Sequence, residues 1–332
     1  MPDTTKIDEK LVSIISPCYN GESFVHRFLD SVLAQDYPNI EVIFIDDGST
    51  DSTARIVQSY IPKFAEQQYS LQYYYQINRG QAAAINNGLT KIQGAYLMCM
   101  DSDDILLPTA ISEKVEYLES HPQIDLVICQ GFVVKESDTS CALSILRREH
   151  NGAPDNLFQD LIDDRNVTYT PAAYLTRTSA FFEAIPSRHI YDSREGQNSQ
   201  LLLPLAHNAA YGYIDKPLFK YVMRANSHSR GHRDYEALRQ RQLEAKVIKT
   251  QTICEIPHMG EEEKEKWISR VSNNCNIWLM EVALNHYRIH DWFSIYKHEK
   301  NLGIIWKYNP LNFYMRKIIN HTSFHIVSIF NK

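Results

Sequence analysis

The sequence predicts an α/β protein with a mostly parallel sheet that carries helices on both faces, followed by a helical C-terminal region. Three observations support this fold class. Short apolar runs alternate with helical patterns three times in the first hundred residues. Polar, turn-forming residues follow several of these runs, and long charged helical patterns begin only after about residue 231.

The first part of the chain supplies the alternation. Four apolar runs have the length and composition of buried strands: residues 11–16, 41–45, 71–76 and 96–100. Three segments between them have apolar residues at helical spacing or are rich in alanine, which predicts helices: residues 24–33, 52–67 and 82–91. Strands that are joined in this way by helices run parallel.

After Pro108 the pattern is less regular. The sequence predicts a polar, irregular excursion over residues 136–166 that contains a short helix at 157–162. The remaining expected elements are a helix at 110–120, strands at 124–134 and 171–175, a helix at 201–209, and strands at 213–214 and 218–223.

The C-terminal hundred residues differ in character. Three charged patterns predict long helices: residues 235–253, 260–286 and 292–300. We therefore expect a domain boundary near residue 230, with a main domain over residues 1–230 and a helical extension over 231–332.

Composition and charge narrow the class of protein. The chain has 332 residues, 44% of them hydrophobic, and a net charge of −6, which argues against a general nucleic-acid binder. Its six cysteines contain no C-x-x-C pair, so we expect buried thiols in a reducing compartment rather than disulfides or a zinc site. Residues 1–10 lack a signal-peptide pattern and no apolar run approaches membrane-spanning length, so a cytoplasmic location is expected.

Three carboxylates follow the strand expected at residues 96–100. Asp101, Asp103 and Asp104 come within four residues at the carboxyl end of that strand, the edge where ligands bind in open α/β sheets. Like charges gathered there need a cation or hydrogen-bond donors. A divalent ion, Mn²⁺ or Mg²⁺, shared with phosphate oxygens would meet that need. The alternative is an acid-rich turn in which Asp103 or Asp104 caps the next helix.

Other strand ends carry similar polar segments, at residues 17–21 and 46–51, and residues 78–81 lead into a helix. The carboxyl ends of parallel strands meet at one edge of a sheet, so the strand-end segments should converge with the acid cluster. This arrangement predicts a nucleotide site.

Five short pieces together resemble an inverting glycosyltransferase of family 2 with the GT-A fold, a Rossmann-like nucleotide-binding fold. They are Ser-Pro-Cys-Tyr-Asn at 16–20, Ser-Val-Leu-Ala-Gln-Asp-Tyr at 31–37, Ile-Asp-Asp-Gly-Ser-Thr-Asp at 45–51, Asn-Arg-Gly at 78–80 and Asp-Ser-Asp-Asp at 101–104. The resemblance implies a nucleotide-sugar half over residues 1–108 and an acceptor half over 109–230. It hardly covers the last hundred residues.

The resemblance also implies donor-binding roles. Pro17 and Tyr19 would line the nucleobase pocket, and backbone groups of the loop through Asn20 would form hydrogen bonds with the edge of the base. Asp47 would accept a hydrogen bond from a ring N–H of the base. The alternative for Asp46 and Asp47 is capping of the following helix.

The diphosphate and metal would lie beside the acid cluster. By resemblance, Asp103 is the direct ligand of Mn²⁺ or Mg²⁺, and Asp101 binds the ribose or a metal-bound water, or shares the metal. Asp104 would support these two side chains. Arg79 or Gln81 would reach the ribose or the diphosphate.

The catalytic base departs from the family pattern, which places Glu-Asp before the acceptor helix. Alignment on that helix puts Gln197 and Asn198 at these positions, and neither amide is a useful proton acceptor. Three interpretations are open. Glu195 or Asp192 has taken over as the base, which we favour; the acceptor is a phosphate that needs no base; or the enzyme is weak or inactive. A local Arg194–Glu195 ion pair, with catalysis elsewhere, is the structural alternative.

A second departure lies in the later Tyr-Arg-x-His element. Here Arg224 occupies the usual histidine position. A guanidinium does not ligate a metal, but it can clamp a diphosphate bidentately. His228, four residues later, is a candidate metal ligand or diphosphate contact, although a solvated loop histidine is the commoner case.

The sequence thus predicts transfer of a sugar from a nucleotide donor, UDP-linked, to a glycan or lipid-linked acceptor in surface polysaccharide synthesis. The alternatives are a sugar-nucleotide-binding protein of low or no activity and transfer to a phosphate such as polyprenyl phosphate. A nucleotidyltransferase is disfavoured because residues 17–21 contain one glycine and no lysine, and a dehydrogenase is excluded because no G-x-G-x-x-G occurs. Residues 301–332 mix aromatic and basic residues without an acid, which predicts either peripheral contact with the inner face of a membrane or an ordinary packing helix or tail.

Overall fold

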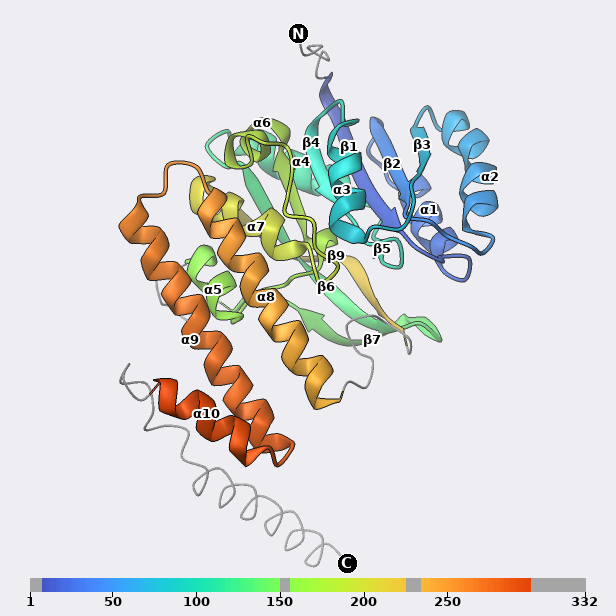
Figure 1. The fold of residues 1–332 in the computed structure, drawn as a ribbon. Coiled ribbons are helices and arrows are strands. Elements are labelled where there is room, and N and C mark those ends of the chain that lie inside the picture. The colour runs from blue at the N-terminus through green and yellow to red at the C-terminus, as the bar shows by residue number, and fades with distance from the viewer. Residues whose placement is uncertain (1–7, 150–155, 225–233, 300–332) are drawn as a thin grey trace, which may run out of the picture. The chain divides into compact units, whose positions relative to one another are not determined.

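The computed structural model describes residues 8–149, 156–224 and 234–299 (Figure 1). The chain divides into two compact units. The first comprises Met1–Gly231 and Ile248–Ile268, and the second comprises His232–Val247 and Ser269–Lys332. The helical C-terminal region expected from the sequence is present, and two of its helices contribute residues to both units. The domain boundary near residue 230 stays a prediction.

The first unit opens with four parallel strands in the order β3-β2-β1-β4. Their bounds are Asp8–Cys18 for β1, Ile40–Asp46 for β2, Ser70–Tyr75 for β3 and Gly94–Cys99 for β4. The connecting helices are α1 (Val25–Leu33), α2 (Thr53–Glu66) and α3 (Gln81–Leu89). The predicted strand–helix alternation is confirmed, and every residue of β2 is buried, as expected for a central parallel strand.

The sheet continues beyond β4 with mixed strand directions, in the order β8-β6-β9-β5. Strand β8 runs antiparallel to β4 and β6, β6 runs parallel to β9, and β5 and β7 pair antiparallel with β9 and β6. The bounds are Ile105–Leu106 for β5, Leu126–Lys135 for β6, Asp138–Leu146 for β7, Tyr174–Arg177 for β8 and Tyr211–Met223 for β9. The helices of this half are α4 (Ala110–Ser120), α5 (Leu157–Asp163), α6 (Thr178–Ala184) and α7 (Asn198–Asn208).

Four details in this half differ from the sequence prediction. Strand β7 lies where an irregular segment was expected, because most of its residues are exposed and no apolar periodicity marks it. The strand expected at 171–175 begins only at Tyr174, after a 3₁₀ turn over Pro171–Ala173. Strand β9 is continuous where two strands were expected, and helix α6 was not predicted.

A buried carboxylate holds the parallel strands in register. Glu41, on β2, is 2% exposed and accepts hydrogen bonds from Ser13 Oγ at 2.5 Å and the Gln93 backbone N–H at 2.7 Å. Gln72 Nε2 donates to its second oxygen at 3.1 Å. Because a buried charge is costly without such partners, this network specifies how β1, β2 and β3 align.

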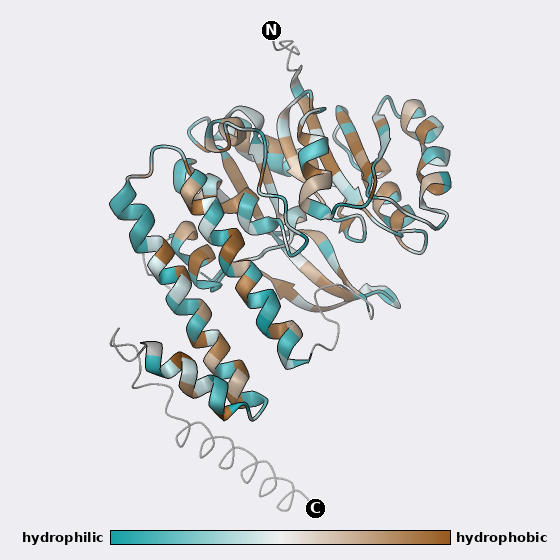
Figure 2. Cartoon of the chain, in the orientation of Figure 1, coloured by the Kyte–Doolittle hydropathy of each residue, from teal (hydrophilic) through white to brown (hydrophobic). Residues whose placement is uncertain are grey.

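The C-terminal helices are α8 (Tyr235–Glu255), α9 (Glu261–Asn285) and α10 (Ile289–Glu299). Within the second unit, an apolar cluster is formed by Tyr235, Met280, Val282, Ala283, Leu284 and Trp292. Apolar and polar residues mix along these helices, as Figure 2 shows. Among the described residues, no helix combines the length and the apolar character needed to cross a bilayer.

Candidate active site

The carboxyl ends of β1, β2 and β4 bring three polar segments together. The Asp47 backbone N–H donates to the Cys18 carbonyl at 2.8 Å, which joins the end of β2 to that of β1. The Met100 N–H donates to the Ile15 carbonyl at 2.9 Å, which places the acid cluster beside the same strand. The strand-end segments therefore lie at one edge of the sheet, as the parallel order requires.

The loop after β1 is tied down and offers one aromatic side chain to solvent. Asn20 has a positive φ of 50°, its N–H donates to Ser49 Oγ at 2.9 Å, and its side-chain oxygen accepts from the Thr50 N–H at 2.8 Å. Pro17 is buried near the end of β1, whereas Tyr19 is 52% exposed. An exposed ring on a fixed loop is suited to stacking on a planar ligand.

Asp47 braces the segment that follows β3. Its carboxylate is 4% exposed and accepts from Gln76 Nε2 at 2.7 Å, from the Arg79 N–H at 2.9 Å and from the Gly80 N–H at 2.8 Å. Gly80 has a φ of +93°, a backbone conformation that favours glycine. These bonds fix the turn into α3, so Asp47 does not cap α2.

Asp46 has a local structural role instead. Its carboxylate accepts from the Ser49 N–H at 2.7 Å and from the Tyr73 hydroxyl at 2.6 Å. It is fully buried and binds the turn after β2 to the neighbouring strand β3.

The three carboxyls of the acid cluster after β4 have few polar partners among the described residues. Asp101 Oδ1 accepts from Gln81 Nε2 at 2.6 Å, and Asp103 Oδ2 lies 3.0 Å from Arg224 Nε. Asp104 Oδ1 accepts from the Val222 N–H at 3.0 Å, but its buried Oδ2 has no hydrogen-bond partner among the described residues.

The pKa values of all three carboxyls are raised, because the site disfavours their negatively charged forms. Burial, and then repulsion from Asp103, raise the pKa of Asp101 to about 7. Burial raises the pKa of Asp103, and burial together with the two neighbouring acids raises the pKa of Asp104 well above its usual range. A bound cation would relieve this repulsion and favour the ionised forms.

The residues present fit a hard divalent ion. Asp101 and Asp103 supply carboxylate oxygens, the donors that Mg²⁺ and Mn²⁺ prefer, and such ions are often held by one or two carboxylates plus substrate phosphates. The described residues contain no group of three or more histidine, cysteine or acidic side chains that could hold a metal without such a substrate. His228, the other predicted ligand, lies outside the described residues.

Residues 190–194, before α7, bind to α3 and to the turn that leads into it, and we call this segment the strap. Asp192 accepts from Arg79 Nη2 and from Asn86 Nδ2, both at 2.8 Å. Asn86 also exchanges hydrogen bonds of 2.8 Å with the backbone of Ile190, and Arg194 Nη1 donates to Asn78 Oδ1 at 3.1 Å. Arg79, a predicted donor-binding residue, is thus paired with Asp192, a predicted general base.

The predicted base region has a different environment. Glu195 is partly buried, and its backbone N–H donates to Ser193 Oγ at 3.1 Å. Asn198 begins α7, and its buried side-chain oxygen has no hydrogen-bond partner among the described residues. It lines a pocket between β4 and α7 together with Cys99 and Leu202. The roles of Glu195, Asp192 and Asn198 stay predictions.

Sequence reasoning missed several residues that shape this site. Phe24 lies under the Arg224 guanidinium, 4.0 Å from its ring centre, and Asn86 anchors the strap to α3. Gln76 supports Asp47. Each contact joins residues far apart in the chain, so no local pattern could have identified them.

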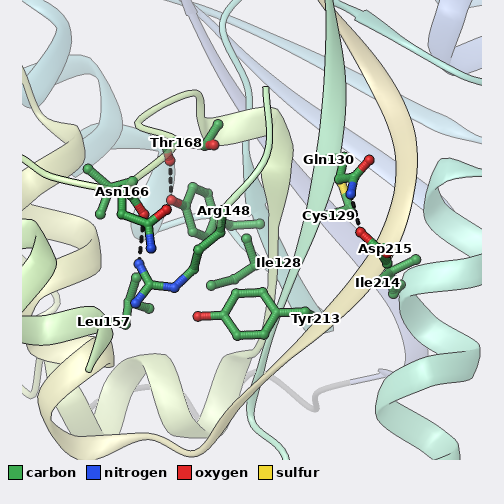
Figure 3. Close-up of a pocket in the computed structure, with 12 residues that line it drawn as sticks. Ile128, Cys129, Gln130, Arg148, Leu157, Asn166, Thr168, Tyr213, Ile214 and Asp215 are labelled. Carbon is green, nitrogen blue, oxygen red and sulfur yellow. Dashed lines mark hydrogen bonds between the residues drawn. The ribbon is translucent and has the colours of Figure 1, made fainter. Parts of the chain in front are cut away.

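A second pocket in the first unit has no evident catalytic arrangement (Figure 3). Arg148 points into it, donates to the Asn166 carbonyl at 2.7 Å and pairs with Asp160. The Tyr174 hydroxyl donates to the Thr168 carbonyl, and Gln130 Nε2 donates to Asp215. These polar groups bond to one another, which assigns them to local stability.

Comparisons with known sequences identify the family of the chain. The family described as glycosyl transferase family 2 matches residues 13–182. An uncharacterized glycosyltransferase of Rickettsia conorii is 33% identical over 192 residues, which span 55% of this chain and 30% of the relative. The glycosyltransferase GlyA of Streptococcus pneumoniae is 28% identical over 243 residues, or 68% of this chain and 32% of the relative. The chain thus spans about a third of the length of these curated relatives.

Solved structures show the same fold. The S. aureus protein TarS, residues 1–349, in complex with UDP-GlcNAc, matches 89% of this chain and 93% of its own, with a TM-score of 0.55 and 17% identity. The mannosyltransferase PcManGT from Pyrobaculum calidifontis, in complex with GDP-Man and Mn²⁺, matches 93% and 85%, with a TM-score of 0.54 and 17% identity. The family match covers about half of the 332 residues, and on that basis the chain belongs to glycosyl transferase family 2.

Proposed function

We propose that this protein is a metal-dependent, inverting glycosyltransferase that moves a sugar from a nucleotide-diphosphate donor, UDP-linked, to a glycan or lipid-linked acceptor. The observation that carries the proposal is the gathering of Tyr19, Asp47, Asp101 and Asp103 at one edge of the sheet. The names of the relatives and the donor complexes of two proteins with this fold support it.

Asp47 has a free position to bind the nucleobase of the donor. A carboxylate offers about four lone-pair positions, and three are used by Gln76, Arg79 and Gly80. The remaining position can accept from a ring N–H, which uracil possesses. The exposed ring of Tyr19 would stack on the same base.

The metal would be held by Asp103, with Asp101 as a second ligand or a partner of the ribose. When bound, Mn²⁺ or Mg²⁺ would offset the negative charge that develops on the leaving diphosphate. Arg224 lies against Asp103, and its guanidinium would bind phosphate oxygens. Gln81 orients Asp101 through its hydrogen bond.

Glu195 is the favoured general base. The Asn198 amide does not accept a proton usefully. Asp192 is bound by Arg79 and Asn86, so it would have to give up at least one of these bonds to contact an acceptor hydroxyl. Transfer to a phosphate acceptor is the second candidate, because a phosphate is already anionic and the amide at Asn198 would then suffice.

Calorimetry against a panel of nucleotide-sugars with Mn²⁺ tests donor binding. We expect heat of binding with one UDP-sugar, and loss of its Mn²⁺-dependent part in Asp103→Ala. Asp36→Ala, at an exposed carboxylate, is the matched control and should bind as the wild type does. Unchanged metal-dependent binding in Asp103→Ala would contradict the metal assignment, and absence of binding to every nucleotide-sugar would contradict the function.

Transfer assays test which residue is the general base. If Glu195 is the base, Glu195→Gln should lower the transfer rate by at least about a hundredfold, since general-base catalysis contributes about 10²–10⁴-fold. Asp192→Asn should lower it less. If both variants retain full transfer, the assignment fails and the phosphate-acceptor alternative gains support.

We further propose a cytoplasmic protein that contacts the inner face of a membrane through residues 301–332 and acts in surface polysaccharide synthesis. The support is the basic and aromatic composition of that segment. Sedimentation with anionic vesicles, with and without residues 301–332, tests it. Equal binding of the two forms would refute the membrane contact.

A further inference from the structure

Four charged side chains of alternating sign meet beside the acid cluster. Arg27, on α1, places Nη2 at 3.0 Å from Oε1 of Glu136, which follows β6. Arg224, which follows β9, places Nε at 3.0 Å from Asp103. The end of β6 and the end of β9 are adjacent, because the Glu136 N–H donates to the Met223 carbonyl at 3.0 Å.

Glu136 adjoins the residue that contacts Asp103, because its N–H bonds to Met223, which directly precedes Arg224. Phe24 lies one helical turn before Arg27, and its ring supports the guanidinium of Arg224 at 4.0 Å. Phe24 and Glu136 thus connect Arg27 to Arg224, and Arg224 contacts the side chain that is proposed to hold the metal.

One donor of Arg27 is unused, and one donor of Arg224 meets Asp103 only as an ion pair. The Nε atoms of Arg27 and Arg224 are buried, and neither makes a hydrogen bond to a described residue. The 3.0 Å approach of Arg224 to Asp103 is an ion pair without hydrogen-bond geometry. A buried donor without an acceptor is costly, so Arg27 Nε indicates a place for a ligand oxygen.

We infer that Arg27 and Arg224 form a paired site for a phosphate group beside Asp103, and that Glu136 holds Arg27 when the ligand is absent. The inference rests on the proposed function and extends it by a residue, Arg27, that the family resemblance does not assign.

The chemistry favours phosphate. A divalent ion on Asp103 would repel the Arg224 guanidinium and free it for another anion. Phosphate offers several acceptor oxygens and up to two charges, which match two guanidinium groups. A sugar hydroxyl would satisfy the unused Nε donor of Arg27 but would leave the charge of Arg224 unbalanced.

The phosphate has two possible sources, the diphosphate of the donor and a phosphate of a lipid-linked acceptor. Calorimetry in the presence of Mn²⁺ separates them with three probes: inorganic pyrophosphate, UDP, and geranyl diphosphate added to UDP-loaded protein. The variants are Arg27→Gln and Glu136→Gln. Arg165→Gln, at an arginine that is 72% exposed, is the control.

We expect Arg27→Gln to weaken pyrophosphate binding by about 10- to 100-fold, the range for loss of a hydrogen bond to a charged group. Glu136→Gln should tighten it several-fold, because the competing carboxylate is gone. Arg165→Gln should have no effect. A purely structural ion pair would not make the two variants change affinity in opposite directions.

The other two probes identify the source. Weaker UDP binding in Arg27→Gln assigns the site to the donor diphosphate. Unchanged UDP binding with weaker geranyl diphosphate binding assigns it to the acceptor. Wild-type affinity for all three probes in folded Arg27→Gln would overturn the inference, and so would weaker pyrophosphate binding in Glu136→Gln. If the wild type binds pyrophosphate but neither UDP nor any nucleotide-sugar, the proposed function fails while the arginine site stands.

Discussion

Replacing Asp47 by asparagine tests the idea that this carboxylate organises the donor site. The substitution keeps the size of the side chain and one oxygen, so the packing is unchanged. The wild-type carboxylate accepts three hydrogen bonds, from Gln76 and Arg79 on Oδ1 and from Gly80 on Oδ2. In the variant, an amide NH₂ must face at least one of these donors.

The expected loss of stability follows from these bonds. A hydrogen bond to a charged group contributes about 1.5–3 kcal/mol, and each buried donor left unpaired costs about 1–3 kcal/mol. Asp47 is 4% exposed, so water does not replace the lost partner. We therefore expect the first unit to lose about 3 kcal/mol, a decrease in Tm on the order of 6–12 °C for a domain of this size.

Circular dichroism melting measures the stability, and calorimetry with UDP and Mn²⁺ measures nucleotide affinity. Asp36→Asn, at an exposed carboxylate, is the matched control and should melt with the wild type. We also expect UDP affinity to fall at least about tenfold, because the turn that carries Arg79 loses its support. An Asp47→Asn protein that melts within 1 °C of the wild type, as about 0.3 kcal/mol would allow, and binds UDP equally well would refute the reasoning.

Three further predictions concern the metal site, the core and the strap. In the folded, metal-free protein the pKa of Asp101 is raised to about 7, so its protonated form stabilises the fold at low pH. This contribution is complete below the unfolded pKa and is lost as pH rises through about 7. Denaturation from pH 5 to 8 should show a decline in the free energy of unfolding, and Asp101→Asn should reduce that decline. Gly88→Ala should destabilise the protein by about 1–3 kcal/mol, because a Cβ there would lie 2.6 Å from Ile15 Cγ2. This loss would outweigh the preference of a helix for alanine over glycine, about 1 kcal/mol. A higher urea midpoint in the variant would contradict this packing. Asp192→Ala should change stability by less than about 1 kcal/mol, because its ion pair with Arg79 is exposed; a loss of several kcal/mol on denaturation would show that the strap is structural.

Local patterns were sufficient for much of the fold. Apolar runs of strand length and helical spacing in the first 120 residues identified β1 to β4 and α1 to α4, and helix α4 has the predicted bounds, Ala110–Ser120. These signals are local because burial of one face imposes a period on the sequence. Strand β7 and helix α6 escaped prediction, since exposed strands and short helices leave a weak periodic signal.

The sequence by itself determined the α/β class, the family and the acid cluster at Asp101 and Asp103, because strand ends and turn residues are encoded in adjacent positions. Only the tertiary structure decided which charges are paired. Asp192 meets Arg79 across 113 residues, and Arg224 reaches Asp103 from the far end of β9. Such partners depend on how the strands and helices pack, and that information is spread over the whole chain.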